Sequence, residues 1–192
     1  MISYSKAVNE HDLNHVYRLR YKVYCTERHF ESALDYPHEL EQDALDPYSI
    51  HFIARIGTVP LGTVRLILRN PLGFPVENHC GVRISNQQTV VEISRLAVSK
   101  ETCQRAAVPQ KAVVLGLFRE LYRESRRIDV EFCYAAMSLS LYRLLDRCHI
   151  RFNQIGKPVE YHGIRAPFMA GINEMVSVMY ASNQSLYSFF TQ

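Results

Sequence analysis

The stretch Glu39–Arg69, "ELEQDALDPYSIHFIARIGTVPLGTVRLILR", places a run of acids directly before two strand-like segments. The run contains the carboxylates Glu39, Glu41, Asp43 and Asp46. The segments "IHFIARIG" and "PLGTVRLILR" are apolar and are joined by a short turn around residues 57–60, which predicts an antiparallel hairpin. An acidic run is usually a solvated loop. Arg65 inside the second apolar segment raises the question of whether these carboxylates have buried partners.

A third core strand is predicted from "TVVEISRLAVS", residues 89–99. Strict two-residue alternation puts Glu92 and Ser94 on one face and Arg95 on the other, unless a bulge intervenes. Polar residues that interrupt an apolar strand tend to mark functional sites or buried ion networks.

The N-terminal helix is predicted over residues 10–30, "EHDLNHVYRLRYKVYCTERHF", with Asn9 as its N-cap and Asp12 at the third helical position. Helical spacing places Arg20 on the inward stripe. A buried arginine needs a carboxylate partner, because an unpaired buried charge is very costly. The alternative is that Arg20 snorkels at the edge of the stripe.

The remaining elements complete a mixed sheet. The expected order is β-α-β-β-β-α-β-α-β, with a long loop over residues 70–88, a helix that begins near Pro109, and one C-terminal helix. This order predicts an α/β or α+β fold with helices on both faces of a central mixed sheet. The length of 192 residues predicts a single domain over residues 1–192.

These arginines and acids come from separate segments, and the simplest physics brings them together as one ion network. Its expected members are Arg20, Arg65, Arg95, Glu41, Asp43 and Asp46, with Glu92 as a further acid. The network either orders the N-terminal segment or forms an active-site wall, and it can serve both purposes. The glycine and spacing of an EF-hand are absent, so no metal is predicted.

Composition excludes several classes of protein. The net charge is +3, from 22 basic and 19 acidic residues, which is too weak to indicate nucleic-acid binding. The five cysteines include no CxxC pair, which favours reduced thiols in a cytoplasmic protein, and Cys133 is read as a small buried hydrophobe. No signal peptide and no membrane span are predicted.

Four motifs together, "RLRYKVYCTERHF", "ELEQDALDPYSIHFIAR", "GTVRLIL" and "VVEISRLAV", resemble the acyl-homoserine-lactone (autoinducer) synthases of the GNAT acyltransferase superfamily. The chain is more similar still to the long-chain N-acyl amino acid synthases, including the branch associated with PEP-CTERM/exosortase systems. "IGKPVEYHGIRAPF" resembles the C-terminal strand region of that branch. The resemblance covers most of the chain and is most specific in the first ~90 residues.

The resemblance implies a GNAT-like fold with a splayed sheet, and site residues that coincide with the charge pattern. The family's N-terminal arginine falls on Arg20, its strand arginine on Arg65, and its aromatic pair, often Phe and Trp, on Tyr24 and Phe30. Its acids fall on Glu41, Asp43 and Asp46, and its E-x-S-R motif falls on Glu92, Ser94 and Arg95. His162 and Arg165 are candidate acceptor-side residues, and a turn-stabilising role is the alternative for them.

The resemblance also implies an acyl donor on acyl carrier protein and an amino-acid-derived acceptor. GNAT enzymes that use acetyl-CoA carry a glycine-rich turn that cradles the CoA pyrophosphate. Here "SKETCQRAAVPQKAV" has no glycine, which favours the acyl-phosphopantetheine of a carrier protein and no tightly bound cofactor. Carrier proteins are acidic, and the candidate dock is the basic set Lys100, Arg105, Lys111, Arg119, Arg123, Arg126 and Arg127. The alternative for the last four is an ordinary solvated helix face.

The predicted reaction is direct acyl transfer from a thioester to an amine. Glu92 is the candidate base, because desolvation can raise a carboxylate pKa toward neutrality, and a purely structural anchor is the alternative. Ser94 and Arg95 complete the candidate catalytic group. Two other functions compete: an acyl-homoserine-lactone synthase using S-adenosylmethionine, and a catalytically silent GNAT-like protein that binds acyl carrier protein or lipid.

Overall fold

The computed structural model describes residues 1–85 and 88–192. The chain forms two compact units, each built from two segments: Met1–Ile67 with Ser94–Leu121, and Leu68–Ile93 with Tyr122–Gln192. Strand β4 (Val90–Val98) and helix α4 (Gln110–Arg127) each contribute residues to both units. A single domain over the whole chain stays a prediction.

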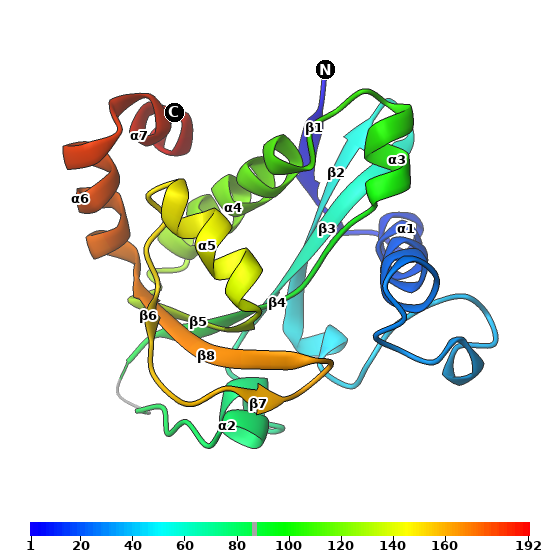
Figure 1. The fold of residues 1–192 in the computed structure, drawn as a ribbon, viewed down its shortest axis with the longest axis horizontal. Helices are drawn as coiled ribbons and strands as arrows, with labels where there is room; N and C mark the ends of the chain where they lie inside the picture. Colours follow the sequence, from blue (N-terminus) through cyan, green and yellow to red (C-terminus); the bar gives the residue numbers. More distant parts are fainter. Residues whose placement is uncertain (86–87) are drawn as a thin grey trace. The chain divides into compact units, whose positions relative to one another are not determined.

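The first unit is organised around the predicted hairpin, which is confirmed (Figure 1). The hairpin consists of β2 (Ser49–Ile56) and β3 (Val59–Ile67). The unit also contains β1 (Ser3–Lys6), α1 (Glu10–Tyr21) and α3 (Lys100–Arg105). β1 pairs antiparallel with β2, and β2 pairs antiparallel with β3 up to the pair Ile56 and Val59. The two residues between them form the turn, and Gly57 supplies its positive φ of 55°.

Helix α1 begins as predicted and ends earlier. The Asn9 side chain accepts a hydrogen bond from the Asp12 N–H at 2.8 Å, which satisfies a free amide of the first turn. After Tyr21 the chain continues as a π-helical stretch, Lys22–Glu27, so the regular helix does not reach Phe30.

The inward stripe of α1 packs on the sheet of its own unit. Val16 joins a buried cluster with Ile53 of β2, and Leu19 joins another with Ala97 of β4. Arg20, beside Leu19 on the helix, is therefore directed into the interior rather than snorkelling at its edge.

Strand β4 departs from the expected alternation at Arg95. Its φ is 48°, in the left-handed region that an arginine rarely adopts. This irregularity corrects the prediction that Ser94 and Arg95 face opposite sides, because both contact the same group of charged residues.

The second unit contains a sheet in which β5 lies between β4 and β8. Its elements are α2 (Pro75–Cys80), β5 (Phe132–Met137), α5 (Leu139–Arg147), β6 (Asn153–Gln154), β7 (Val159–Glu160), β8 (Ile164–Gly171), α6 (Ile172–Ser182) and α7 (Gln184–Thr191). β5 runs parallel to β4 and antiparallel to β8, which makes the sheet mixed. Ser138 caps α5 as predicted, accepting from the Leu141 N–H at 3.3 Å.

Three predictions about helices are wrong in part. The expected loop 70–88 contains α2, the glycine-free stretch after β4 contains α3, and the C-terminal helix breaks into α6 and α7 at Asn183. Asn183 ends α6 and its side chain caps α7 by accepting from the Leu186 N–H at 3.0 Å. Within the described ranges, none of the helices has the length and apolar character needed to cross a bilayer.

Candidate active site

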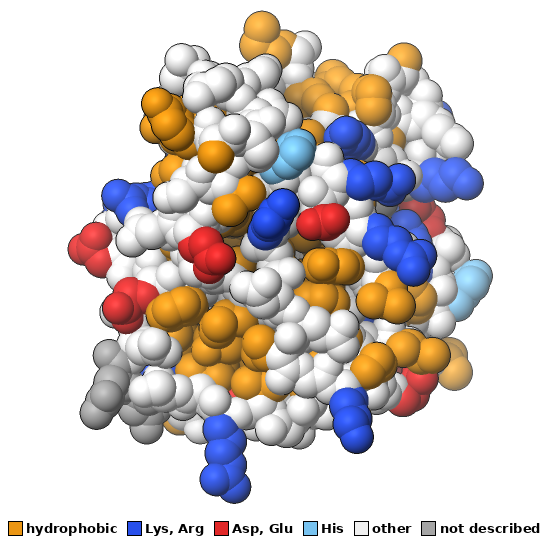
Figure 2. Space-filling model, turned by 60° about the vertical axis from the view of Figure 1, so that its left-hand side comes forward, with side chains coloured by type: hydrophobic (Ala, Val, Ile, Leu, Met, Phe, Trp, Pro, Cys, Tyr) orange, Lys and Arg blue, Asp and Glu red, His pale blue; other side chains and the backbone are white. Residues whose placement is uncertain are grey.

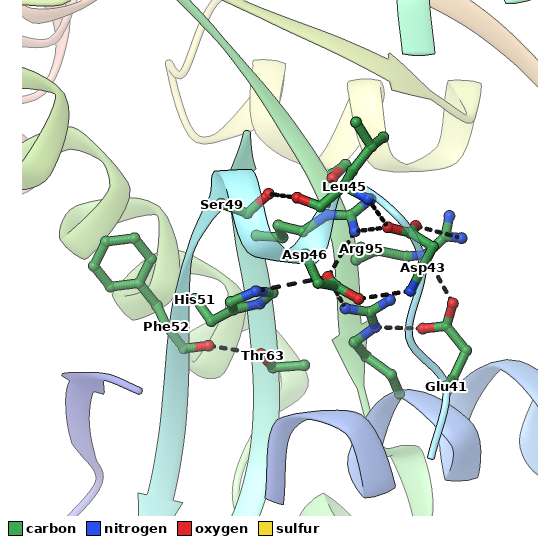
Figure 3. Close-up of polar contacts among 12 residues, drawn as sticks. Glu41, Asp43, Leu45, Asp46, Ser49, His51, Phe52, Thr63 and Arg95 are labelled. Atoms are coloured by element: carbon green, nitrogen blue, oxygen red, sulfur yellow. Dashed lines mark hydrogen bonds and ion pairs between the residues drawn. The ribbon is translucent and has the colours of Figure 1, made fainter. Parts of the chain in front are cut away.

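The predicted ion network forms within the first unit (Figure 3). Its arginines come from α1, β3 and β4, and its acids come from the segment that precedes β2. Arg20 pairs through Nε with Glu41 and through Nη1 with Asp46 Oδ1 at 2.7 Å. Arg65 Nη1 lies 2.6 Å from Asp43 Oδ1 and 2.7 Å from Asp46 Oδ1.

Arg95 closes the network from β4. Its Nε lies 3.1 Å from Glu41 Oε1, and its Nη2 lies 3.2 Å from Asp43 Oδ2 and 3.7 Å from Glu31 Oε1. Ser94, the neighbouring residue, accepts a hydrogen bond from Arg65 Nε at 2.9 Å. The six predicted members are thus brought together, and Glu31 is an additional acid at the rim.

Burial makes these charges mutually dependent. The side chains of Arg20 and Glu41 are 0% exposed and that of Arg65 is 1% exposed. Burial alone lowers the pKa of Arg20, but the attraction of Glu41 and Asp46 outweighs it and raises that pKa above its ordinary value. Burial raises the pKa of Asp43, and the hydrogen bond and charge of Arg65 overcome this and lower it to about 2.

The acids also fold their own segment. Asp46 Oδ2 accepts the Asp43 N–H at 2.7 Å, and Asp43 Oδ1 accepts the Leu45 N–H at 2.9 Å. Ser49 Oγ then donates to the Leu45 carbonyl at 2.7 Å, at the start of β2. The acidic run is therefore the counter-charge of buried arginines and not a solvated loop, although Glu39 is exposed.

The predicted aromatic pair lies beside Arg95. The Tyr24 and Phe30 ring centroids are 6.4 Å apart, and the Arg95 guanidinium carbon is 5.8 Å from the Tyr24 centroid. Phe30 is 38% exposed, so this edge of the network presents an aromatic surface. Burial raises the pKa of Tyr24 to about 12 despite the opposing charge of Arg95, so its hydroxyl is not a base near neutral pH.

Glu92 lies in the second unit and is 1% exposed. Its Oε2 accepts the Val76 N–H, at the start of α2, at 3.0 Å. The residue aligned with it on β5 is Tyr134. A buried carboxylate with a fixed amide donor suits either an oriented base or a structural anchor.

The acceptor-side candidates also lie in the second unit, around β7 and β8. His162 has a φ of 50° and contacts the Tyr161 ring edge-on at 4.4 Å, and Tyr161 stacks on His79 at 4.2 Å. Arg165 Nη1 donates to the Ile164 carbonyl at 3.1 Å. A left-handed residue before Gly163 fits the turn-stabilising alternative, while the ring cluster gives His162 a fixed orientation.

Sequence reasoning missed His51 of β2. This side chain is 3% exposed, and its Nε2 lies 3.6 Å from Asp46 Oδ1 (Figure 3). Neither ring nitrogen has a hydrogen bond within the described part of the chain. Burial lowers its pKa to about 4, with Asp46 opposing that shift, so His51 is neutral near pH 7. A single histidine in an apolar strand has no periodic pattern of its own. The acidic run that precedes the strand was the feature of the sequence that could have indicated an ionic neighbour for His51.

The basic residues proposed as a dock are distributed over α3 and α4. Arg105 and Lys22 both pair with Glu101, Arg119 pairs with Glu120, and Arg127 pairs with Glu124. Arg126 donates to Asn173 Oδ1 at 2.6 Å. Lys100 and Lys111 are exposed. Several members are therefore partly neutralised within the chain.

Comparisons with known proteins agree with the fold and the motifs. A family model described as N-acyl amino acid synthase FeeM matches residues 15–171. A search of curated protein sequences gives no match.

Solved structures with the same fold are similar over nearly the whole chain. FeeM, an N-acyl amino acid synthase from uncultured soil microbes, matches with a TM-score of 0.69 and 16% identity, covering 92% of this chain and 93% of FeeM. The acyl-homoserine-lactone synthase LasI matches with a TM-score of 0.75 and 14% identity over 94% of each chain. BjaI, a CoA-dependent acyl-homoserine lactone synthase, matches with a TM-score of 0.70 and 19% identity, over 94% of this chain and 88% of its own.

At these identities the solved structures establish the fold, a mixed sheet flanked by helices of the GNAT-like type, as predicted. The family match extends over far more than half of the sequence and includes every predicted site residue. The chain therefore belongs to the FeeM family of N-acyl amino acid synthases, which are acyltransferases.

Proposed function

We propose that this protein transfers a long-chain acyl group from acyl carrier protein to the amine of an amino acid, giving an N-acyl amino acid. The observation that carries this proposal is the family match over residues 15–171, which includes the E-x-S-R motif of Glu92, Ser94 and Arg95. In the reaction the thioester C–S bond breaks, an amide C–N bond forms, and the phosphopantetheine thiol is released.

Glu92 is proposed as the base that removes a proton from the α-ammonium of the acceptor, directly or through a water. Its side chain is almost fully buried, and the Val76 N–H fixes one carboxylate oxygen. This hydrogen bond holds the carboxylate in a fixed orientation, as a positioned base requires.

The substitution Glu92→Gln separates a base from an anchor. The amide of glutamine keeps the size of the side chain and an oxygen that accepts the Val76 N–H, but it cannot take up a proton. We expect kcat to fall by about 10²- to 10⁴-fold with an unchanged melting temperature. Nearly wild-type turnover in this variant would assign Glu92 to the anchor role. The exposed Glu174, in the first turn of α6, gives the matched control Glu174→Gln, whose activity should be unchanged.

The network residues are proposed to hold the wall of the site. Arg20 and Arg65 are buried and paired with carboxylates, so we do not assign either side chain to direct contact with a substrate. Arg95 is 13% exposed and lies against Tyr24, beside Phe30, and we assign these three residues to the surface that substrate meets. Ser94, held by Arg65, is proposed to orient the pantetheine arm or the acceptor.

The stretch after β4 supports a carrier-protein donor over CoA. Helix α3 begins at Lys100 and is capped by Ser99, whose Oγ accepts the Thr102 N–H at 3.1 Å. Ser99 Oγ also donates to Glu27 Oε1 at 2.5 Å, and the Lys100 N–H donates to Glu27 Oε2 at 3.0 Å. The Glu27 carboxylate thus occupies the helix start, where a CoA pyrophosphate would need free amides.

Basic surface is available for an acidic carrier protein. Figure 2 shows Lys and Arg side chains on one face of the molecule, with hydrophobic side chains among them. We propose that exposed basic side chains of the candidate dock receive the carrier, and that His162 and Arg165 meet the acceptor.

The test is an assay of the purified protein with acyl carrier protein or CoA as the acyl carrier and a panel of amino acids, with products identified by mass spectrometry. N-acyl amino acids from the carrier-protein thioester support the proposal, and preference for the CoA thioester would overturn the donor. An acyl-homoserine lactone formed from S-adenosylmethionine would move the protein to the alternative that LasI and BjaI represent. Absence of turnover by the folded protein would favour a binding role. Because the described cysteines are free, we place the reaction in the cytoplasm, and an association with exosortase systems stays a prediction.

A further inference from the structure

The first turns of α1 carry three potential metal ligands outside the ion network. His11, Asp12 and His15 each offer one ligand atom, and these atoms all lie within 4.8 Å of one another. The two histidines are four residues apart, so they lie on one side of the helix, and their ring centroids are 4.4 Å apart. Imidazole nitrogen with carboxylate oxygen is a donor set that suits zinc and similar divalent ions.

His15 has a nitrogen with no assigned role. Its Nδ1 is buried and has no hydrogen-bond partner within residues 1–85 and 88–192. Buried polar atoms nearly always have a hydrogen-bond partner or a ligand. A buried imidazole nitrogen without one, beside a second imidazole, therefore indicates a position for a bound ligand.

His11 is free to adjust toward such a partner. Its side chain is 79% exposed, and its Nδ1 lies 3.9 Å from Asp12 Oδ1. Ligand atoms around a tetrahedral ion with ~2.1 Å bonds lie roughly 3.4 Å apart, so only a small rotation of an exposed ring is needed. Solvent would fill the remaining coordination position.

Arg55 of β2 opposes the ion. Its Nη2 lies 2.5 Å from Asp12 Oδ1, while Asn9 Nδ2 donates to Asp12 Oδ2 at 3.1 Å. A cation bound at Asp12 would compete with this guanidinium for the same oxygen and would be repelled by its charge. Occupancy should therefore depend on the Asp12–Arg55 pair.

We propose that His11, Asp12 and His15 form a binding site for a borderline divalent metal ion of the zinc class. The ion links the first two turns of α1, the helix that carries Arg20 into the ion network five residues later. The site takes no part in acyl transfer, and its effect is to stabilise the start of this helix in the metal-bound protein.

The experiment is calorimetric titration of the tag-free full-length protein with ZnCl₂, followed by Co²⁺ absorption spectra. We expect one saturable site with a cobalt spectrum of nitrogen and oxygen ligands. His11→Gln and His15→Gln should each weaken binding by about 10-fold or more, as loss of metal-site partners commonly does. The exposed His38 supplies the control His38→Gln, which should bind like the parent protein.

Arg55→Gln supplies a test in the opposite direction. Removing the competing guanidinium should tighten binding several-fold, a gain that nonspecific surface binding would not show. Three results would each overturn the proposal: no saturable binding, a thiolate spectrum that points to cysteine ligands, or equal losses in His11→Gln and His38→Gln. Circular dichroism of each variant without metal confirms that it is folded, so loss of structure cannot imitate loss of a ligand.

Discussion

Replacing Arg20 by methionine tests whether the network holds the fold of the first unit. Methionine keeps an unbranched chain of similar length but removes the guanidinium that pairs with Glu41 and Asp46. Removing one partner of a buried ion pair typically costs about 3–5 kcal/mol, because the opposite charge is left without compensation. Here Glu41 keeps Arg95 and Asp46 keeps Arg65, so we expect the lower end, about 3 kcal/mol.

A loss of this size is a large share of the stability of a domain, which is about 5–15 kcal/mol. The assay is urea unfolding followed by far-ultraviolet circular dichroism, because the chain contains no tryptophan. Arg18, exposed on the same helix, provides the control Arg18→Met, expected within about 0.5 kcal/mol of wild type.

The double variant Arg20→Met/Glu41→Gln then restores the balance of charge. We expect it to be more stable than the sum of the two single changes predicts, with a coupling energy of about 1–3 kcal/mol. A cost below about 1 kcal/mol for Arg20→Met, or additive effects of the two changes, would contradict this role of the network.

Three further predictions concern pH and packing. The pKa of Asp43 is about 2 in the folded protein, below its value in the unfolded chain. The ionised Asp43 therefore stabilises the fold above pH ~4, and this stabilisation is lost as the pH falls toward 2. The melting temperatures of the wild type and Asp43→Asn should converge over that range. The pKa of His51 in the folded protein is about 4, so below pH ~6.5 this histidine is protonated in the unfolded state but stays neutral in the folded state. The free energy of unfolding should therefore fall by up to about 3 kcal/mol between pH 6.5 and 4. His51→Phe should lack this slope in denaturation curves, and parallel pH profiles for the two proteins would contradict the buried neutral assignment. A Cβ at Gly116 would overlap the Tyr4 ring, so Gly116→Ala should cost about 1–3 kcal/mol in thermal unfolding, and adding Tyr4→Ala should recover part of that loss.

The network could be predicted because two of its arginines, Arg20 and Arg65, lie in elements with a periodic pattern. The spacing of the α1 stripe placed Arg20 inward, strand alternation placed Arg65 in an apolar run, and buried guanidinium groups require carboxylates. The acidic segment that follows α1 contains the carboxylates that lie nearest to these arginines in the sequence. The atom-to-atom pairing, with Asp46 shared between Arg20 and Arg65, depends on tertiary positions that no local pattern specifies.

The predictions that proved wrong did so for local reasons. The left-handed backbone at Arg95 interrupts a strand whose composition is otherwise regular, so alternation put its side chain on the wrong face. Helices α2 and α3 have six residues each, too short for a periodic signal, and α2 lies among prolines and glycines that indicate a loop. The break at Asn183 depends on a side-chain cap that competes with the helix ladder.

The sharing of carboxylates among the three arginines has an evolutionary consequence. Because Asp46 serves both Arg20 and Arg65, and Glu41 serves both Arg20 and Arg95, a change of charge at any of these residues removes one of the ion-pair partners of two neighbours. A variant with a single replacement is therefore destabilised, whereas a variant in which one arginine and one acid are both replaced keeps the charges balanced. Relatives of this chain should keep the set whole or lose its members in opposite-charge pairs, so these positions should covary strongly even where overall identity is low.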